Sequence, residues 1–244
     1  MTDIGKIFDL VLPVTGQTRL MVLFSTIGKI FDLVLPATGQ TCLMVLFSTI
    51  FSLILGFPLG VLLCVSDPFS GIKPRKVLFQ VLTRIVNALR SFPFIILMIL
   101  LFPLSRIIVG KTIGTAATVV PLSVAAAPFV ARIIENSLKE VDTGVIQAAR
   151  AMGSTTMQII LKVLIPEALP SLIDGITLTI INLIGYSAMA GAIGGGGLGD
   201  LAIRYGYQRF RPEIMAIAVI IILVMVELIQ LIGSRISGKI SSKR

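Results

Sequence analysis

Side chains able to carry out catalysis or to bind a metal are scarce in this sequence. Its 244 residues include no His and no Trp, so imidazole metal ligands and a histidine general base are both absent. The two cysteines, Cys42 and Cys64, lie in or beside one apolar stretch, where packing is the simplest role for them. We therefore expect no catalytic residue and no metal site, and we do not expect an enzyme.

Two short matches to phosphate-binding motifs do not support nucleotide binding. Gly110-Lys111-Thr112 is similar to the end of a P-loop, but position 105 is Ser where that motif has Gly, and no strand precedes it. The glycines of 194–199 fit G-x-G-x-x-G, yet a run of four glycines does so trivially and here follows an apolar segment too long for a strand.

Two acidic residues lie within the apolar segments. Asp174 is near the start of one segment and Glu227 is near the end of the last. An ionisable group inside a membrane is a candidate for function. Both residues are nevertheless close enough to a segment end to reach the membrane interface, which is the role we expect for them.

The segment from Gln147 to Pro166 combines small residues with amphipathic character. Ala148 and Ala149 precede Gly153, and Pro166 redirects the chain into the next apolar segment. Small side chains allow a helix to sink into a groove on a partner, and glycine bends or ends it. The pattern predicts a short docking helix on the water side of the membrane; an ordinary loop is the alternative.

The elements that position these residues are membrane helices. The chain is 55% hydrophobic and 14% charged, with a mean hydropathy of +1.00, whereas soluble domains carry about 25% charged residues. Its apolar runs approach the ~20 residues that cross a bilayer. We predict an all-α polytopic membrane protein with five spans, preceded in one case by an amphipathic helix over 77–90 that enters the membrane from the interface. The predicted spans are Leu43–Val65, Phe92–Val109, Ile113–Ile133, Leu169–Ile193 and Ile214–Ile232.

Charge sets the expected orientation. The net charge is +9, and most of the 21 Lys and Arg residues fall in the segments 67–90, 132–166 and 234–244. Cytoplasmic loops carry the excess of basic residues. We therefore expect the docking helix and the C-terminus in the cytoplasm and the N-terminus outside, and we expect no nucleic acid partner.

The N-terminal region is a tandem repeat. Residues 4–26 and 27–49 are identical except at Val14/Ala37 and Arg19/Cys42. Charges interrupt the first copy, so we interpret residues 1–40 as an extracytoplasmic surface or interfacial extension. We expect transport to survive deletion of the extra copy, residues 4–26. Residues 41–244 are then the membrane domain.

One motif and three further segments of the sequence resemble those of a known family. Ala148-Ala149, Gly153 and the Val163-x-Ile165-Pro166 element resemble the EAA motif of type I ABC importer permeases, with Gln147 in place of the leading Glu. The segments 90–94, 127–132 and 185–189 are similar to the methionine-importer members of that family. The resemblance extends from Thr41 to the C-terminus.

This resemblance implies a complex in the bacterial cytoplasmic (inner) membrane. Two copies of the chain would form a homodimer on two ABC ATPase subunits, which bind ATP and Mg, so this chain itself would hold no cofactor. A substrate-binding lipoprotein would deliver methionine from outside. The coupling helix would lie near 142–160, with ATPase coupling assigned to Gln147, Ala148, Ala149, Gly153, Val163, Ile165 and Pro166. Tyr186, Ser187 and Met189 would line the translocation pathway or its gate.

Two other functions stay open on the sequence alone. The same architecture could serve another amino acid or small solute, because the difference would lie in the binding protein and a few pathway residues. A stand-alone secondary transporter is the more distant alternative, which would need an acidic residue at the membrane midplane and no docking helix.

Overall fold

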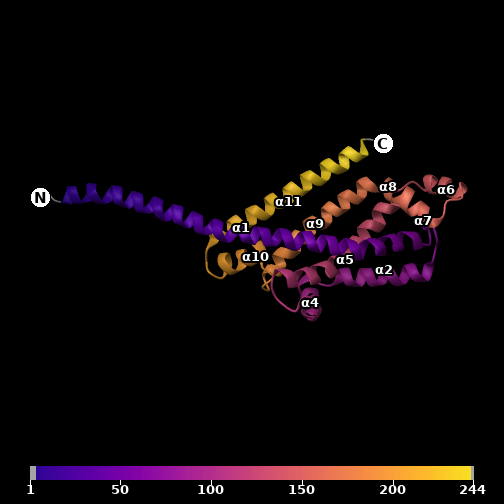
Figure 1. Ribbon diagram of the computed structural model, residues 1–244, viewed down its shortest axis with the longest axis horizontal. Helices are drawn as coiled ribbons and strands as arrows, with labels where there is room; N and C mark the ends of the chain where they lie inside the picture. The colour runs from indigo at the N-terminus through magenta and orange to yellow at the C-terminus, as the bar shows by residue number, and fades with distance from the viewer. Residues whose placement is uncertain (1–3, 243–244) are drawn as a thin grey trace.

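The computed structural model describes the backbone of residues 4–242 and the side chains of residues 32–242. Within that range the secondary structure is entirely helical, so the expected all-α fold is confirmed (Figure 1). The helices are α1 (Ile4–Ser66), α2 (Lys76–Ser91), α3 (Phe94–Leu100), α4 (Phe102–Val109), α5 (Thr115–Lys139), α6 (Thr143–Ala151), α7 (Thr156–Ile159), η1 (Ile160–Leu164), α8 (Ile165–Glu167), α9 (Leu169–Gly191), α10 (Gly197–Leu201), η2 (Ala202–Tyr207) and α11 (Pro212–Ser241).

Helix α1 runs without a break across the boundary expected between residues 40 and 41. It contains 63 residues, so its length is about 95 Å at 1.5 Å per residue, three times the hydrocarbon thickness of about 30 Å. The part that is long and apolar enough to span is Asp32–Ser66. Val34 and Ala37 are already buried against Leu198 and Ile214, so α1 joins the bundle before the expected boundary, and its N-terminal part projects beyond it (Figure 1).

Four helices of the described region could cross a membrane alone: the Asp32–Ser66 part of α1, α5, α9 and α11. They coincide with four of the five predicted spans, although α5 and α11 extend further towards their C-termini than predicted. A fifth crossing is available if α2 and α3, which are bent by 102° relative to each other, count as one broken span.

The predicted span Phe92–Val109 is wrong. The segment forms two short helices, α3 with seven residues and α4 with eight, each about a third of the hydrocarbon thickness. Pro103 lies in the first turn of α4, where its missing N–H is tolerated, whereas inside one continuous helix it would remove a hydrogen bond. A crossing at this place would instead combine α2, the helix expected over 77–90, with α3.

Helices α1 and α5 touch backbone to backbone at two glycines. A Cβ atom on Gly56 would lie 2.7 Å from the Ala127 carbonyl oxygen, and one on Gly60 would lie 2.6 Å from that of Ala131. Small residues permit this approach in a membrane, where helices associate by packing and not by expulsion of water. These contacts fix the register of α1 against α5.

The glycine cluster at 194–199 connects α9 to α10 and has a structural role. Gly196 and Gly197 adopt φ of +82° and +76°, a region that favours glycine. The Gln40 side-chain oxygen accepts a hydrogen bond from the Gly197 amide, and the Thr41 hydroxyl accepts one from the Leu198 amide, both at 2.9 Å. The second copy of the repeat therefore supplies the groups that cap α10.

Substitution of Gly60 tests the α1–α5 contact. We expect Gly60→Val to lower the free energy of unfolding by about 1–3 kcal/mol, because the added atoms would overlap Ala131 and Ile134. Gly39→Ala in the same helix is the matched control: a Cβ there meets nothing within 4 Å, and alanine favours helix by about 1 kcal/mol. Thermal unfolding in detergent measures both variants, and equal stability of the two would contradict the close packing.

Candidate functional site

The predicted docking segment forms a compact tip at one end of the molecule. Helices α6 and α7, followed by η1 and α8, lie together at the end opposite to the N-terminus of α1 (Figure 1). This is the region where the sequence places the coupling helix, near 142–160.

Local capping explains the shape of the tip. Asp142 caps α6 by accepting a hydrogen bond of 2.6 Å from the Gly144 amide. At the other end Gly153 adopts a φ of +79°, and its amide donates to the Arg150 carbonyl at 2.9 Å, an arrangement that glycine adopts without strain. Thr155 and Gln158 then form a reciprocal capping box that starts α7.

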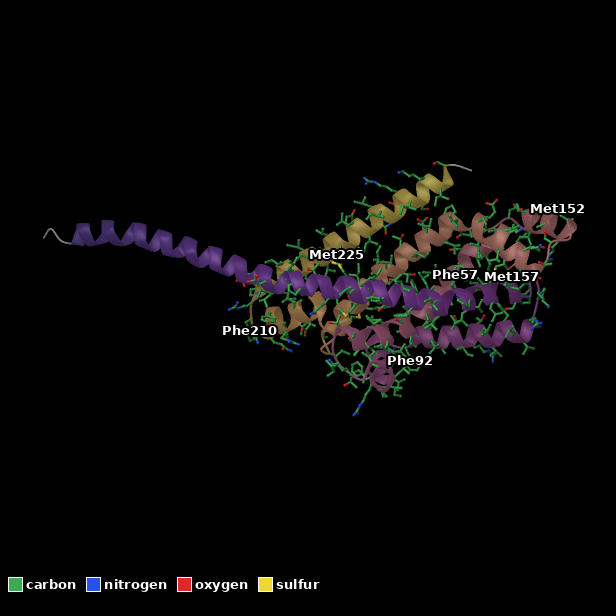
Figure 2. The ribbon with its side chains drawn as sticks, in the orientation of Figure 1. Phe57, Phe92, Met152, Met157, Phe210 and Met225 are labelled. Atoms are coloured by element: carbon green, nitrogen blue, oxygen red, sulfur yellow. The ribbon has the colours of Figure 1, made fainter. Side chains whose placement is uncertain are left out.

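The exposed surface of the tip is partly apolar. Met152 is 79% exposed and Met157 63% exposed, on either side of Gly153 (Figure 2). Val145 and Leu161 are exposed nearby; we refer to these four residues as the tip patch. An exposed apolar patch on a membrane protein's polar end indicates a protein-binding surface, and methionine adapts its shape to a partner. The sequence reasoning missed both methionines, although their place beside Gly153 in the water-side segment could have identified them.

The predicted coupling residues divide into two groups. Gln147, Ala148, Gly153 and Pro166 are exposed, whereas Ala149 is buried. Val163 and Ile165 are half-buried and pack against a core cluster with Ile134 and Leu138 of α5. The exposed residues Gln147, Ala148 and Gly153 are available to a partner, whereas exposed Pro166 already has a contact within the chain. The buried and half-buried residues Ala149, Val163 and Ile165 attach the tip to the bundle.

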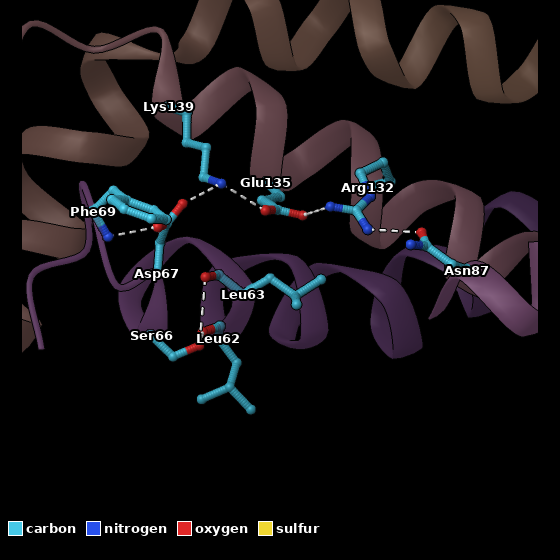
Figure 3. Close-up of polar contacts among 9 residues, drawn as sticks. All are labelled: Leu62, Leu63, Ser66, Asp67, Phe69, Asn87, Arg132, Glu135 and Lys139. Carbon is cyan, nitrogen blue, oxygen red and sulfur yellow. Dashed lines mark hydrogen bonds and ion pairs between the residues drawn. The ribbon is translucent and has the colours of Figure 1, made fainter. Parts of the chain in front are cut away.

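A chain of charged side chains lies where α5 approaches the tip (Figure 3). The Lys139 ammonium is 2.5 Å from an Asp67 oxygen and 2.7 Å from a Glu135 oxygen, and the Arg132 guanidinium is 2.6 Å from the other Glu135 oxygen. Arg132 also donates to the Asn87 side-chain oxygen at 2.8 Å. We refer to this set as the α5 charge chain; it links the segment after α1, helix α5 and helix α2.

The Asp67 carboxylate stays charged in this setting. Burial alone would raise its pKa, but hydrogen bonds from the Lys139 ammonium and from the Phe69 amide together lower the pKa below its ordinary value. The Glu135 side chain is 1% exposed and lies between two cations. A buried carboxylate is tolerated when it is paired and hydrogen-bonded on both oxygens, as this one is.

Arg150 connects the tip to the same region. Its guanidinium donates to the Ile72 carbonyl oxygen and, at 3.5 Å, to that of Gly71. These carbonyls belong to the loop that begins at Asp67. The loop over 67–75 is therefore held by α6 on one side and by the α5 charge chain on the other.

The predicted pathway residues of α9 have different environments. Tyr186 stacks on Phe94 with ring centroids 4.3 Å apart, and Met189 is 47% exposed. Ser187 is 1% exposed, and its hydroxyl donates to the Ile184 carbonyl. Of the three residues, Ser187 contributes to helix packing in this structure, while Met189 offers the most surface to a pathway.

The two acidic residues also differ. Asp174, exposed at the start of α9, accepts a hydrogen bond of 2.9 Å from Ser237 of α11, which agrees with a place near the segment end. Helix α11 continues to Ser241, so Glu227 lies near the middle of this helix and not near its end as expected. Among the described residues no group of three His, Cys, Asp or Glu side chains could hold a metal ion.

Comparisons with known proteins agree with this arrangement. Residues 56–241 match the family described as binding-protein-dependent transport system inner membrane component. The chain is 48% identical over 189 residues to a probable D-methionine transport system permease protein MetI of Vibrio cholerae, which covers 78% of this chain and 84% of that protein. It is 48% identical over 168 residues to the methionine import system permease protein MetP of Bacillus subtilis, covering 69% of this chain and 76% of that protein.

A solved structure is similar to this chain, and the likeness covers almost the full length of the solved chain. It is described as an inward-facing conformation of the MetNI methionine ABC transporter, with a TM-score of 0.85 and 45% sequence identity. The likeness covers 87% of this chain and 98% of that chain. The arrangement of helices seen here is therefore shared with a membrane transporter subunit.

The α5 charge chain should stabilise the fold in a pH-dependent way. Because the pKa of Asp67 is lowered on folding, its contribution is complete at neutral pH. That contribution is lost as the pH falls through the ordinary value of 3.8 towards the lowered folded value. We expect Asp67→Asn to cost about 1–3 kcal/mol at pH 7, with the gap to wild type narrowing below about pH 4.

Thermal unfolding in detergent at pH 7 and at about pH 3 measures the stability difference between Asp67→Asn and wild type. Arg204→Gln is the control, because its ion pair with Asp200 is more exposed and should contribute little. An Asp67→Asn deficit that is the same at pH 7 and at about pH 3 would contradict the ionic role of Asp67.

Proposed function

Since this chain belongs to the family of binding-protein-dependent transport system inner membrane components, we propose that it is the permease subunit of an ATP-driven importer for methionine. The single observation that carries the substrate is the similarity to methionine permeases from both Vibrio cholerae and Bacillus subtilis. The chain is a multi-pass inner-membrane protein, and ATP is bound and hydrolysed by a separate subunit.

The tip is the surface that engages the ATPase. Gln147 and Ala148, together with Met152 and Met157 of the tip patch, point away from the bundle and would seat in a groove on that subunit. Gly153 ends α6 so that α6 and α7 form one short wedge. Buried Ala149 and half-buried Val163, Ile165 anchor the wedge to α5, which lets a movement of the tip reach the membrane helices.

Movement passes from the tip into the membrane by two routes. Packing of the tip against Ile134 and Leu138 leads directly into α5. The Arg150 contact with the 67–75 loop leads to the α5 charge chain, and from there to α1 and α2. ATP-driven approach of two ATPase subunits would shift both routes together and alternate the pathway between its two faces.

The complete transporter contains more chains than this one. Two copies of the permease pair on two ATPase subunits, and an extracytoplasmic lipoprotein delivers methionine. The tip and the C-terminal end of α11 face the cytoplasm, and the N-terminus lies outside. Met189, supported by Tyr186 on α9, lines the pathway between the two copies. The extra copy of the repeat, residues 4–26, is not required for transport. Val34 and Ala37, by contrast, pack on the bundle, and Gln40 accepts a hydrogen bond from the Gly197 amide.

Reconstitution tests the proposed function. The purified chain would be combined in proteoliposomes with a MetN-type ATPase and a methionine-binding lipoprotein. We expect ATP-dependent uptake of methionine, because the tip and the bundle provide docking and a pathway. Absence of uptake with an ATPase that binds the chain would contradict the proposal.

Variants of Gly153 test the role of the tip in the same assay. Gly153→Val should reduce ATPase binding and uptake about tenfold or more, since a β-branched residue is strained at a φ of +79°. Gly153→Asn is the matched control, because asparagine tolerates this conformation, and a Cβ at this position meets nothing within 4 Å. Equal uptake by Gly153→Val and wild type would overturn the docking role.

A further inference from the structure

Helix α11 is the least covered of the four helices of the described region that could cross a membrane alone. In its most apolar part 11% of the residues are buried, against 33% to 61% in the other three. One side of α11 packs on the bundle through Met225 and Ile229. Another side carries a row of exposed residues at intervals of three and four, which places them on one face of the helix. These residues are Ile220, Leu223, Glu227 and Gln230.

Helix α9 defines the depth of Glu227 in the membrane. Towards one end of α9, the Ser237 hydroxyl of α11 donates a hydrogen bond to Asp174. Towards the other end, Ala218 of α11 packs in one cluster with Leu198, which follows α9 in α10. Glu227 is nine residues after Ala218 and ten residues before Ser237, or about 14 Å and about 15 Å along the helix. Because the hydrocarbon layer is about 30 Å thick, Glu227 lies near its midplane.

Helix α9 brings a second polar group to the same depth. It runs antiparallel to α11 (Figure 1), and its Thr177 packs against Gly233 of α11. Asn182 lies five residues further along α9 and Glu227 six residues back along α11, so the two residues are at one level. Asn182 belongs to a row of exposed and half-buried residues on α9. The row consists of Leu178, Asn182, Gly185 and Met189.

The rows of α9 and α11 face the same side of the bundle. Each row is turned by about 100° in the same sense from the contact between Thr177 and Gly233, because successive residues of a helix are about 100° apart. In antiparallel helices an equal turn from the mutual contact brings both rows to one side. We refer to the two rows together as the α9–α11 face.

Lipid is a poor cover for this face. An acidic side chain at the centre of a membrane helix is costly, and such residues face the protein interior, water or a partner. Within the described part of the chain neither Glu227 nor Gln230 makes a hydrogen bond or an ion pair. The Asn182 side chain donates at 3.1 Å to the Leu178 carbonyl, a contact within its own helix.

The exposed side of α1 is different at the same depth. From Leu43 to Leu55 every exposed residue of α1 is apolar, whereas Ser48, Thr49 and Ser52 are buried. Lipid therefore suits the exposed side of α1 and does not suit the α9–α11 face, so the membrane part of the chain has two unlike surfaces.

We propose that the α9–α11 face is turned towards the second copy of the chain, while the exposed side of α1 contacts lipid. This inference rests on the proposed function, in which two copies form the transporter, and it names the side on which they meet. The ATPase and the binding lipoprotein lie outside the bilayer. At the midplane, the second copy is therefore the protein of this transporter that can cover Glu227.

The face is complementary to a second copy of itself. Asn182 and Gln230 have carboxamide groups, which donate hydrogen bonds to a carboxyl oxygen and accept one from a carboxyl that keeps its proton. Each copy thus offers the groups that Glu227 of the other copy requires, as expected in an assembly with two-fold symmetry. Met189 lies in the same face, so the pathway proposed at this residue runs between the two faces.

Spin labels test which side meets the second copy. In a chain with Cys42→Ala and Cys64→Ala, a nitroxide would be attached at Leu223→Cys or, as the control, at Leu46→Cys. The labelled chain would then be assembled with unlabelled ATPase and binding protein in proteoliposomes.

The two positions are matched in exposure and in depth. Leu223 is 61% and Leu46 is 55% exposed in the single chain. Each lies five residues along its helix from a residue near Leu198, which is Ala218 for Leu223 and Thr41 for Leu46.

We expect oxygen to collide with the label at Leu223→Cys at least about threefold less often than with the label at Leu46→Cys, because a covered face excludes the lipid in which oxygen dissolves. The dipolar distance between the labels of two copies should be shorter at Leu223→Cys. Equal collision rates, or a shorter distance at Leu46→Cys, would overturn the proposal.

A pair of isoleucines gives the same comparison without a nitroxide. A flexible bis-maleimide should link two copies of Ile220→Cys at least about tenfold more efficiently than two copies of Ile50→Cys, since position 220 lies in the α9–α11 face and position 50 on the exposed side of α1. Equal yields of cross-linked dimer would contradict the proposal.

The outcomes separate this proposal from the proposed function. Lack of methionine uptake by the wild-type chain would contradict the proposed function itself. Normal uptake together with equal oxygen collision rates at the two labelled positions would overturn only the assignment of the α9–α11 face.

Discussion

Charged groups beside a membrane must be paired or must meet water, and the α5 charge chain is where this constraint shapes the molecule. Glu135 is buried between Lys139 and Arg132, and Lys139 also holds Asp67. Three segments far apart in the sequence are thereby fixed at one level: the segment after α1, the last turns of α5 and the middle of α2. The loop over 67–75 then provides the carbonyl groups that Arg150 contacts. Without this arrangement the tip would be joined to the bundle by apolar packing alone.

The close contact between α1 and α5 has a different cause. Helices α1 and α5 make their close contact through Gly56 and Gly60, since association inside a membrane depends on packing. The tip and the α5 charge chain are joined through the 67–75 loop, at the end of the bundle proposed to bind the ATPase.

Most membrane helices and the short helix of the tip could be predicted from the sequence, because hydropathy and the Ala148-Ala149…Gly153 spacing are local features. The failure at Phe92–Val109 arises because composition is the same for one span or for two short helices. Pro103 lies in the first turn of α4, but α5 continues through Pro121 and Pro128, so a proline in the sequence did not indicate the break. The α5 charge chain could not be predicted, because Asn87 and Arg132 are 45 positions apart and their contact depends on how α2 packs. Ser187 shows a further limit, since the family resemblance assigned it to the pathway while its hydroxyl bonds to its own helix.

We propose that movement of the tip reaches the membrane helices through Arg150 and the 67–75 loop. The most direct measurement is the number of methionine molecules transported per ATP hydrolysed, determined in proteoliposomes for wild type and Arg150→Gln. A glutamine cannot maintain the charged donor to the Ile72 carbonyl. We expect Arg150→Gln to retain ATP hydrolysis and ATPase binding but to transport several-fold less methionine per ATP. An unchanged ratio would contradict it.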